Sequence, residues 1–145
     1  MHSRKTLLLF FLAAFFTLSC WAESKYESKI TSLKGEKWWG GIVALGSQMP
    51  FKDDIRLFDL ASENLNNQNV PLLLSSEGRY IWSNKPFSFK LENGNLQIFS
   101  DYESLEPILA GNTLKDAYMA ASTKHFPPSG QLPDSLFFSM PQYNT

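Results

Sequence analysis

The fold class is decided by residues 70–99, which read VPLLLSSEGRYIWSNKPFSFKLENGNLQIF. Short apolar runs in this stretch are separated by turn residues at Glu77-Gly78, at Asn84-Lys85-Pro86 and at Asn93-Gly94. Asn-Gly between two alternating runs is a strong hairpin signal, because both residues tolerate a positive φ. Phe87, Phe89 and Leu91 share one face of an alternating run, which is typical of a half-buried strand. The stretch therefore predicts consecutive antiparallel strands joined by tight turns.

Strand signals continue on both sides of this stretch. Residues 38–46 read WWGGIVALG, which predicts a strand with a bulge or tight bend at Gly40-Gly41. Residues 55–60 alternate in part, and Pro107 to Ala110 would form a last strand. Short strands with regular turn signals between them indicate an all-β fold, an antiparallel β-sandwich.

A helix is predicted after the last strand. Asn112 or Thr113 can cap its start, and Asp116 lies in the first turn, where a negative charge is favourable. Leu114, Tyr118 and Ala121 follow the helical i, i+4, i+7 spacing, with Ala117 on the same face, and we expect this stripe to pack on the sandwich. Pro127-Pro128 cannot continue the helix.

Residues 1–22 have the composition of a signal peptide. Arg4 and Lys5 precede an apolar run, Leu7 to Leu18, that is too short to cross a bilayer as a helix. Two processing routes remain open: cleavage after Ala22, or a degenerate lipobox in which Cys20 is lipidated. Either route predicts an exported protein of the periplasm or cell surface, with membrane contact only through a lipid anchor.

Composition argues against several classes of function. The formal net charge is −1, which gives no electrostatic reason to bind nucleic acid or an anionic membrane surface. Cys20 is the only cysteine, and His125 is the one histidine that remains if His2 leaves with the signal peptide. Since zinc sites need several such ligands, we expect no metal and no cofactor.

The acidic and histidine candidates each have a simpler interpretation. Asp53 and Asp54 are adjacent and point apart, as in a solvated turn. The acidic residues of the segment 101–106 offer oxygen ligands for calcium, but they lack EF-hand spacing, which favours a solvated loop. His125 is expected to be a cation at the end of the helix. No Gly-x-Ser-x-Gly nucleophile elbow is present, so the chain shows no catalytic constellation of its own.

Four aromatic residues are candidates for stacking on sugar rings: Trp38, Trp39, Tyr80 and Trp82. Aromatic side chains in a strand-rich domain also commonly form the core. Both interpretations stay open at the sequence level.

Two stretches resemble glycoside hydrolase family 31. Residues 70–82, VPLLLSSEGRYIW, resemble a strand–turn–strand segment of that family's N-terminal β-sandwich. Residues 111–118, GNTLKDAY, followed by Pro127-Pro128 and by LPDSLFF at residues 132–138, resemble its short helix and its connector to the catalytic barrel. The resemblance runs from about Lys37 to the end of the sequence. Asp134 stands where a second proline is common and Leu136-Phe137 replaces the usual Trp-containing start, which leaves the subfamily and substrate open.

The resemblance implies a domain plan. Residues 23–36 are polar and weakly patterned, from which we expect a flexible leader that runs into the first strand. The resemblance implies that a galactose-mutarotase-like sandwich with its closing helix, residues 37–125, follows. Residues 126–135 would be the connector, and residues 136–145 the first strand of a (β/α)8 barrel. The apolar run at residues 136–140 would be an orphan strand, so we expect the sequence to be the front part of a larger protein.

The resemblance also implies an activity, that of a retaining α-glycosidase acting on α-glycosides or oligosaccharides. Its two catalytic aspartates would lie on later barrel strands, beyond Thr145, so no catalytic residue is assigned and this chain alone should be inactive. The family's sandwich lends a loop to the rim of the active site. The turn at Glu77, Gly78 and Arg79 is the candidate for that role, beside a packing role against the barrel.

Two alternatives belong to other classes of protein. A stand-alone carbohydrate-binding module would present exposed, coplanar Trp and Tyr rings, and burial of Trp38, Trp39 and Trp82 would count against it. A surface-anchored structural lipoprotein would carry an acylated Cys20.

Overall fold

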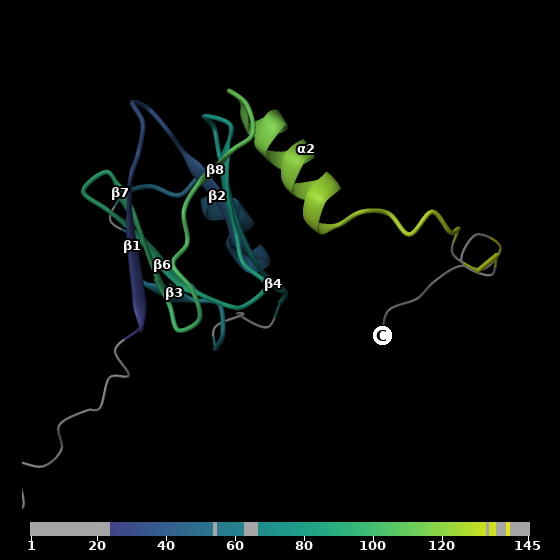
Figure 1. Ribbon diagram of the computed structural model, residues 1–145, viewed down its shortest axis with the longest axis horizontal. Helices are drawn as coiled ribbons and strands as arrows, with labels where there is room; N and C mark the ends of the chain where they lie inside the picture. Colours follow the sequence, from purple (N-terminus) through teal and green to yellow (C-terminus); the bar gives the residue numbers. More distant parts are fainter. Residues whose placement is uncertain (1–23, 54, 63–66, 133, 136–138, 140–145) are drawn as a thin grey trace, which may run out of the picture.

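The computed structural model describes residues 24–53, 55–62, 67–132, 134, 135 and 139. In this part of the chain two antiparallel four-stranded sheets face each other, and one α-helix covers the outside of the second sheet (Figure 1). The first sheet has the strand order β1-β7-β6-β3 and the second has the order β2-β4-β5-β8. The elements are β1 (Tyr26–Thr31), β2 (Trp38–Ile42), the 3-10 helix η1 (Val43–Gln48), β3 (Phe58–Asp59), β4 (Asn69–Ser75), β5 (Arg79–Trp82), β6 (Ser88–Glu92), β7 (Asn95–Ser100), β8 (Ile108–Leu109) and α2 (Leu114–His125).

The core lies between the two sheets. Phe89, Leu96 and Ile98 reach it from the first sheet, and Ile42 and Leu73 reach it from the second. Each of these five side chains is at most 1% exposed. This arrangement confirms the predicted all-β class and the antiparallel, sandwich-like architecture.

The β6–β7 hairpin forms where Asn-Gly predicted it. Asn93 (φ 52°) and Gly94 (φ 69°) both take the left-handed conformation that a two-residue type I′ turn requires. Leu91 then pairs with Leu96 and Phe89 with Ile98, so the predicted apolar face of the hairpin is the buried one.

The two glycines of β2 form the predicted bulge. The register with β4 shifts between Gly40 and Gly41. A Cβ on Gly40 (φ 115°) would lie 2.2 Å from the backbone oxygen of Leu72, so only glycine fits there. The close approach of the β4 backbone thus explains Gly40, whereas a Cβ on Gly41 (φ 76°) would lie 2.9 Å from the Phe89 ring.

Helix α2 has the predicted length and start, but the buried face is narrower than predicted. Thr113 and Asp116 form a reciprocal capping box. Ala117 and Ala121 are fully buried against Tyr80, whereas Tyr118 is 55% exposed. The predicted stripe through Tyr118 is therefore wrong, because two alanines let the helix lie close to the sheet and leave the larger ring outside.

Three further expectations need correction. Residues 23–36 contain β1, which pairs along its whole length with β7, so a flexible leader is wrong there. Residues 43–48 form η1 and not more of the second strand, because pairing with β4 ends at Ile42 and only Leu45 is buried. The partly alternating segment 55–60 contributes only the short strand β3.

Some expectations lie outside the described residues, namely the signal peptide, Cys20, Asp54 and almost all of residues 136–145. Residues 127–132 carry no helix or strand, and Figure 1 shows the chain leaving the end of α2. No helix of the described part is long and apolar enough to cross a membrane.

Candidate functional site

The predicted rim turn at Glu77, Gly78 and Arg79 packs against the start of α2. Gly78 has φ 73°, and a Cβ there would lie 2.2 Å from the backbone carbon and oxygen of Gly111. Its carbonyl oxygen accepts a hydrogen bond of 2.8 Å from the backbone N–H of Ala110. Glu77 stays local, since its Oε1 accepts from the Ser76 hydroxyl at 3.2 Å. The turn thus joins the β4–β5 hairpin to the segment that leads into α2.

Arg79 is held by a glutamate that the sequence analysis did not single out. Its Nε donates to Glu36 Oε1 at 2.9 Å, and its Nη2 donates to Glu36 Oε2 and to the backbone oxygen of Thr31. The guanidinium also lies over the ring of Trp38, 5.6 Å from the ring centroid. Only 14% of the Arg79 side chain is exposed.

The Glu36 carboxylate is fully buried, and both of its oxygens accept hydrogen bonds. Besides Arg79, the Ser75 hydroxyl and the backbone N–H of Leu33 donate to it. Burial alone would raise the pKa of Glu36, but the hydrogen bonds from Arg79, Ser75 and Leu33 outweigh burial and hold that pKa below its ordinary value. Glu36 and Arg79 therefore tie the β1–β2 loop to β4 and β5. The rim role of this turn stays a prediction, and Arg79 has a structural role in any case.

The four candidate sugar-stacking aromatics do not form an exposed platform. Trp38 is 1% exposed and Tyr80 is 2% exposed, so the stacking prediction is wrong for both. Trp82 is half-buried and stacks on the imidazole of His125 with ring centroids 4.5 Å apart. Trp39 is also half-buried, on β2.

His125 is not the solvated cation that the sequence predicted. Its Nε2 is buried, with no hydrogen-bond partner among the described residues, and its ring also meets Tyr80 edge-on. Burial, with a smaller effect from the Lys124 charge, lowers the pKa of His125 below its ordinary value. The structure thus favours the neutral imidazole.

The acidic segment after β7 does not converge on a point. Glu103 accepts a hydrogen bond of 2.9 Å from the hydroxyl of Ser83, while Asp101 and Glu106 are exposed. Among the described residues no group of three His, Cys, Asp or Glu side chains is close enough to hold a metal ion. The calcium interpretation therefore has no support in the described geometry.

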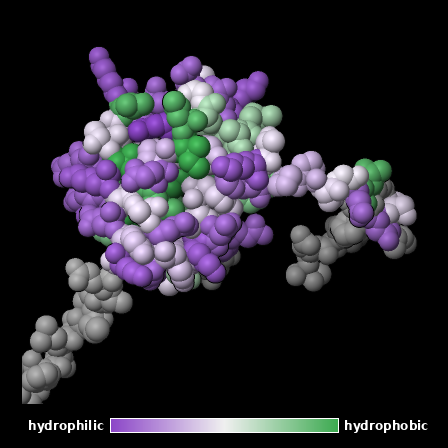
Figure 2. Space-filling view, in the orientation of Figure 1, coloured by the Kyte–Doolittle hydropathy of each residue, from purple (hydrophilic) through white to green (hydrophobic). Residues whose placement is uncertain are grey.

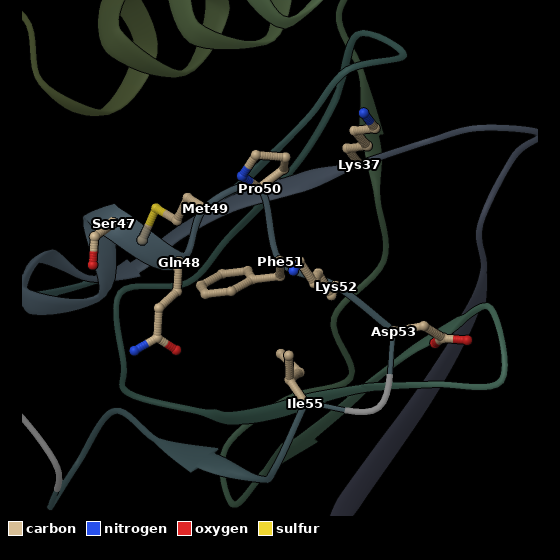
Figure 3. A pocket seen from close by; sticks show the side chains of 9 residues that line it. All are labelled: Lys37, Ser47, Gln48, Met49, Pro50, Phe51, Lys52, Asp53 and Ile55. Carbon is tan, nitrogen blue, oxygen red and sulfur yellow. The ribbon is translucent and has the colours of Figure 1, made fainter.

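A cavity of about 690 Å³ lies beside the loop that follows η1 (Figure 3). The loop is anchored to both sheets. The backbone N–H of Phe51 donates to the Trp38 oxygen of β2 at 2.9 Å, and that of Ile55 donates to the Leu91 oxygen of β6 at 3.1 Å. The cavity is lined by Lys37, Ser47, Gln48, Met49, Pro50, Phe51, Lys52, Asp53 and Ile55.

The lining combines apolar and polar groups. Met49, Pro50 and Ile55 are half-buried and Phe51 is buried, whereas the two lysines, Ser47 and Gln48 are exposed. The sequence predicted only a turn here, because the anchors that open the cavity join residues far apart in the chain. The Met49–Pro50 peptide bond in this loop is cis.

Neither a scan against models of known protein families nor a search of curated proteins found a match for this chain.

Proposed function

We propose that this chain carries the N-terminal sandwich of an exported retaining α-glycosidase that resembles glycoside hydrolase family 31. The sandwich would have the galactose-mutarotase-like fold, and its role would be to support a (β/α)8 barrel that follows the connector of residues 126–135. The barrel would supply the two aspartates that form and hydrolyse a glycosyl-enzyme.

One observation supports this proposal most directly. The two stretches that carry the resemblance, residues 70–82 and the segment that begins at Gly111, meet in space. Gly78, in the turn of the first stretch, packs against Gly111 of the second so closely that a Cβ would not fit. The β6–β7 hairpin lies between these two stretches in the chain, yet Gly78 and Gly111 bring them into direct contact.

Three carboxylates of the described residues have structural partners, which fits a supporting role. Glu36 is occupied by Arg79. Asp59 accepts a hydrogen bond of 2.6 Å from Ser62, and others from Ala61 and Ser88. Burial opposes ionisation of Asp59, but these hydrogen bonds hold its pKa below the ordinary value. Asp116 caps α2.

The test is turnover of aryl α-glycosides. We expect none from the purified 145-residue chain, and turnover with retention of configuration from the protein that also contains the barrel. Turnover by the short chain would contradict the proposal, because catalytic groups would then lie within it.

The proposal places the protein in the periplasm or at the cell surface. Mass spectrometry of the mature N-terminus distinguishes the two processing routes. An acylated Cys20 would indicate lipid anchoring and a start at Glu23 would indicate release, whereas an intact Met1 in the cell's own protein would contradict export.

A further inference from the structure

We propose that the cavity beside η1 binds an acidic carbohydrate, a sugar that carries a carboxylate or a sulfate group. This inference rests on the proposed carbohydrate-processing function and adds to it a site and a ligand class. Nine residues line the cavity, and they combine lysine side chains, apolar side chains and hydrogen-bonding groups.

The charge of the lining favours an anion. Lys37 and Lys52 both line the cavity and are exposed, and neither forms an ion pair with another described residue. The single carboxylate of the lining, Asp53, is engaged elsewhere, since both of its oxygens accept from the backbone N–H of Gly94 at 3.1 Å. Figure 3 shows this carboxylate pointing away from the Phe51 ring. The lining therefore carries two lysines without an ion-pair partner among the described residues, against one Asp53 carboxylate, which keeps its charge and is held by Gly94.

The remaining lining fits a sugar ring. Pyranose rings combine an apolar C–H face with a rim of hydroxyl groups. Met49, Phe51 and Ile55 offer apolar contact, and the side chains of Ser47 and Gln48 offer hydrogen-bond donors and acceptors. Figure 3 shows Gln48, Phe51 and Ile55 extending toward the same region from three parts of the loop. A volume of about 690 Å³ lies within the range of about 300–1,000 Å³ that is usual for small-ligand pockets.

Three described residues of the loop are anchored by backbone hydrogen bonds. The Met49 N–H donates to the Gly46 oxygen at 3.2 Å, and Phe51 and Ile55 are bonded to β2 and β6. Phe51 also packs into the ring cluster of the core, 5.6 Å from Phe89 between centroids. A ligand that enters such a loop loses little binding energy to ordering it.

The test is calorimetric titration of the 145-residue chain with three matched trisaccharides, one neutral, one with a glucuronate and one with a single O-sulfate. We expect at least tenfold tighter binding of an acidic ligand than of the neutral one, and weaker binding at high salt, because exposed charges are screened. The carboxylate and sulfate ligands show which anion the site prefers. Equal affinity for all three, or no binding by any, would overturn the inference, as would inorganic sulfate that binds as tightly as the sulfated sugar.

Charge variants locate the site. The double variant K37Q/K52Q should weaken binding of the acidic ligand at least tenfold and leave any binding of the neutral sugar unchanged. The control K29Q/K34Q removes the same charge from two exposed lysines outside the cavity, and it should bind as the parent does. An equal loss in both variants would show that general attraction and not this cavity holds the ligand.

Failure of this inference is distinguishable from failure of the proposed function. Binding is measured on the chain without a barrel, whereas the proposed function is tested by turnover. A preference for the neutral sugar would overturn the inference that the cavity binds an acidic carbohydrate, but it would leave the glycosidase proposal intact.

Discussion

At the scale of the residue, the pair of Glu36 and Arg79 is the contact whose loss we expect to be most destabilising. Replacing Glu36 with Gln leaves the mostly buried guanidinium of Arg79 without its counter-charge. Breaking one partner of a buried ion pair typically costs about 3–5 kcal/mol, so we predict a decrease of that size in the free energy of unfolding by urea.

The control for this prediction is Glu92→Gln, which removes the more exposed Lys90–Glu92 pair, whose side chains are 29% and 44% exposed. Exposed pairs contribute at most about 1 kcal/mol, so this variant should be close to the parent. Equal effects of the two substitutions would show that Glu36 is not the buried anchor that the structure describes.

The lowered pKa of His125 predicts that the stability of the fold depends on pH. Because its folded pKa is lowered, folding favours the neutral imidazole, and the resulting stability is complete only above the unfolded pKa of about 6.5. Stability should therefore decrease as the pH falls below about 6.5, before the carboxylates of Glu36 and Asp59 are protonated at lower pH.

The variant His125→Phe keeps an aromatic ring against Trp82 and removes the titration. We expect its melting temperature to change less between pH 7 and pH 5 than that of the parent. The same slope in both proteins would contradict a neutral His125 with a buried Nε2.

Glu36 also shows a limit of sequence reasoning at this scale. It lies 43 positions from Arg79, and its own neighbours, Gly35 and Lys37, read as an ordinary exposed loop. A charge that is buried only through pairing of distant strands leaves no local pattern.

At the scale of the element, the turn between β4 and β5 has the tightest packing requirement. Gly78→Ala places a side chain at φ 73° and a Cβ 2.2 Å from the Gly111 backbone. The left-handed conformation costs about 1–2 kcal/mol and the contact adds strain, so we predict a loss of about 3 kcal/mol or more in unfolding free energy.

Gly94→Ala is the matched substitution, because Gly94 has φ 69° and no atom within 4 Å of an added Cβ. It should lose only the conformational part, about 1–2 kcal/mol. If thermal unfolding showed the same loss for both variants, the close packing of the β4–β5 turn on Gly111 would be wrong.

Local chemistry explains which elements could be predicted. The β6–β7 hairpin follows from Asn93-Gly94, and α2 follows from its capping residues, since both signals act within a few residues. Strand β1 could not be located within residues 23–36 from the sequence, because its inward face has one large apolar side chain, Ile30, next to Ser28. Ser28 is buried because its hydroxyl accepts a hydrogen bond of 3.1 Å from the backbone N–H of Leu105, a partner that its own segment does not reveal.

At the scale of the whole molecule, the all-β class followed from the spacing of short strands, but the strand order did not. β1 pairs with β7, and β2 pairs with β4. Each sheet therefore contains a pair of neighbouring strands that do not follow each other in the chain. Figure 2 shows hydrophilic residues over most of the visible face, with apolar residues gathered in a narrower region. The cavity beside η1 depends on that strand order, because its loop is anchored to one strand of each sheet.

The most direct test of the central claim, that this sandwich belongs to a family-31-like α-glycosidase, is the nucleotide sequence downstream of codon 145. We predict an in-frame continuation that encodes alternating strands and helices of a (β/α)8 barrel, with an aspartate at the end of a barrel strand. An untranslated region, or a continuation that encodes an unrelated domain, would contradict the claim.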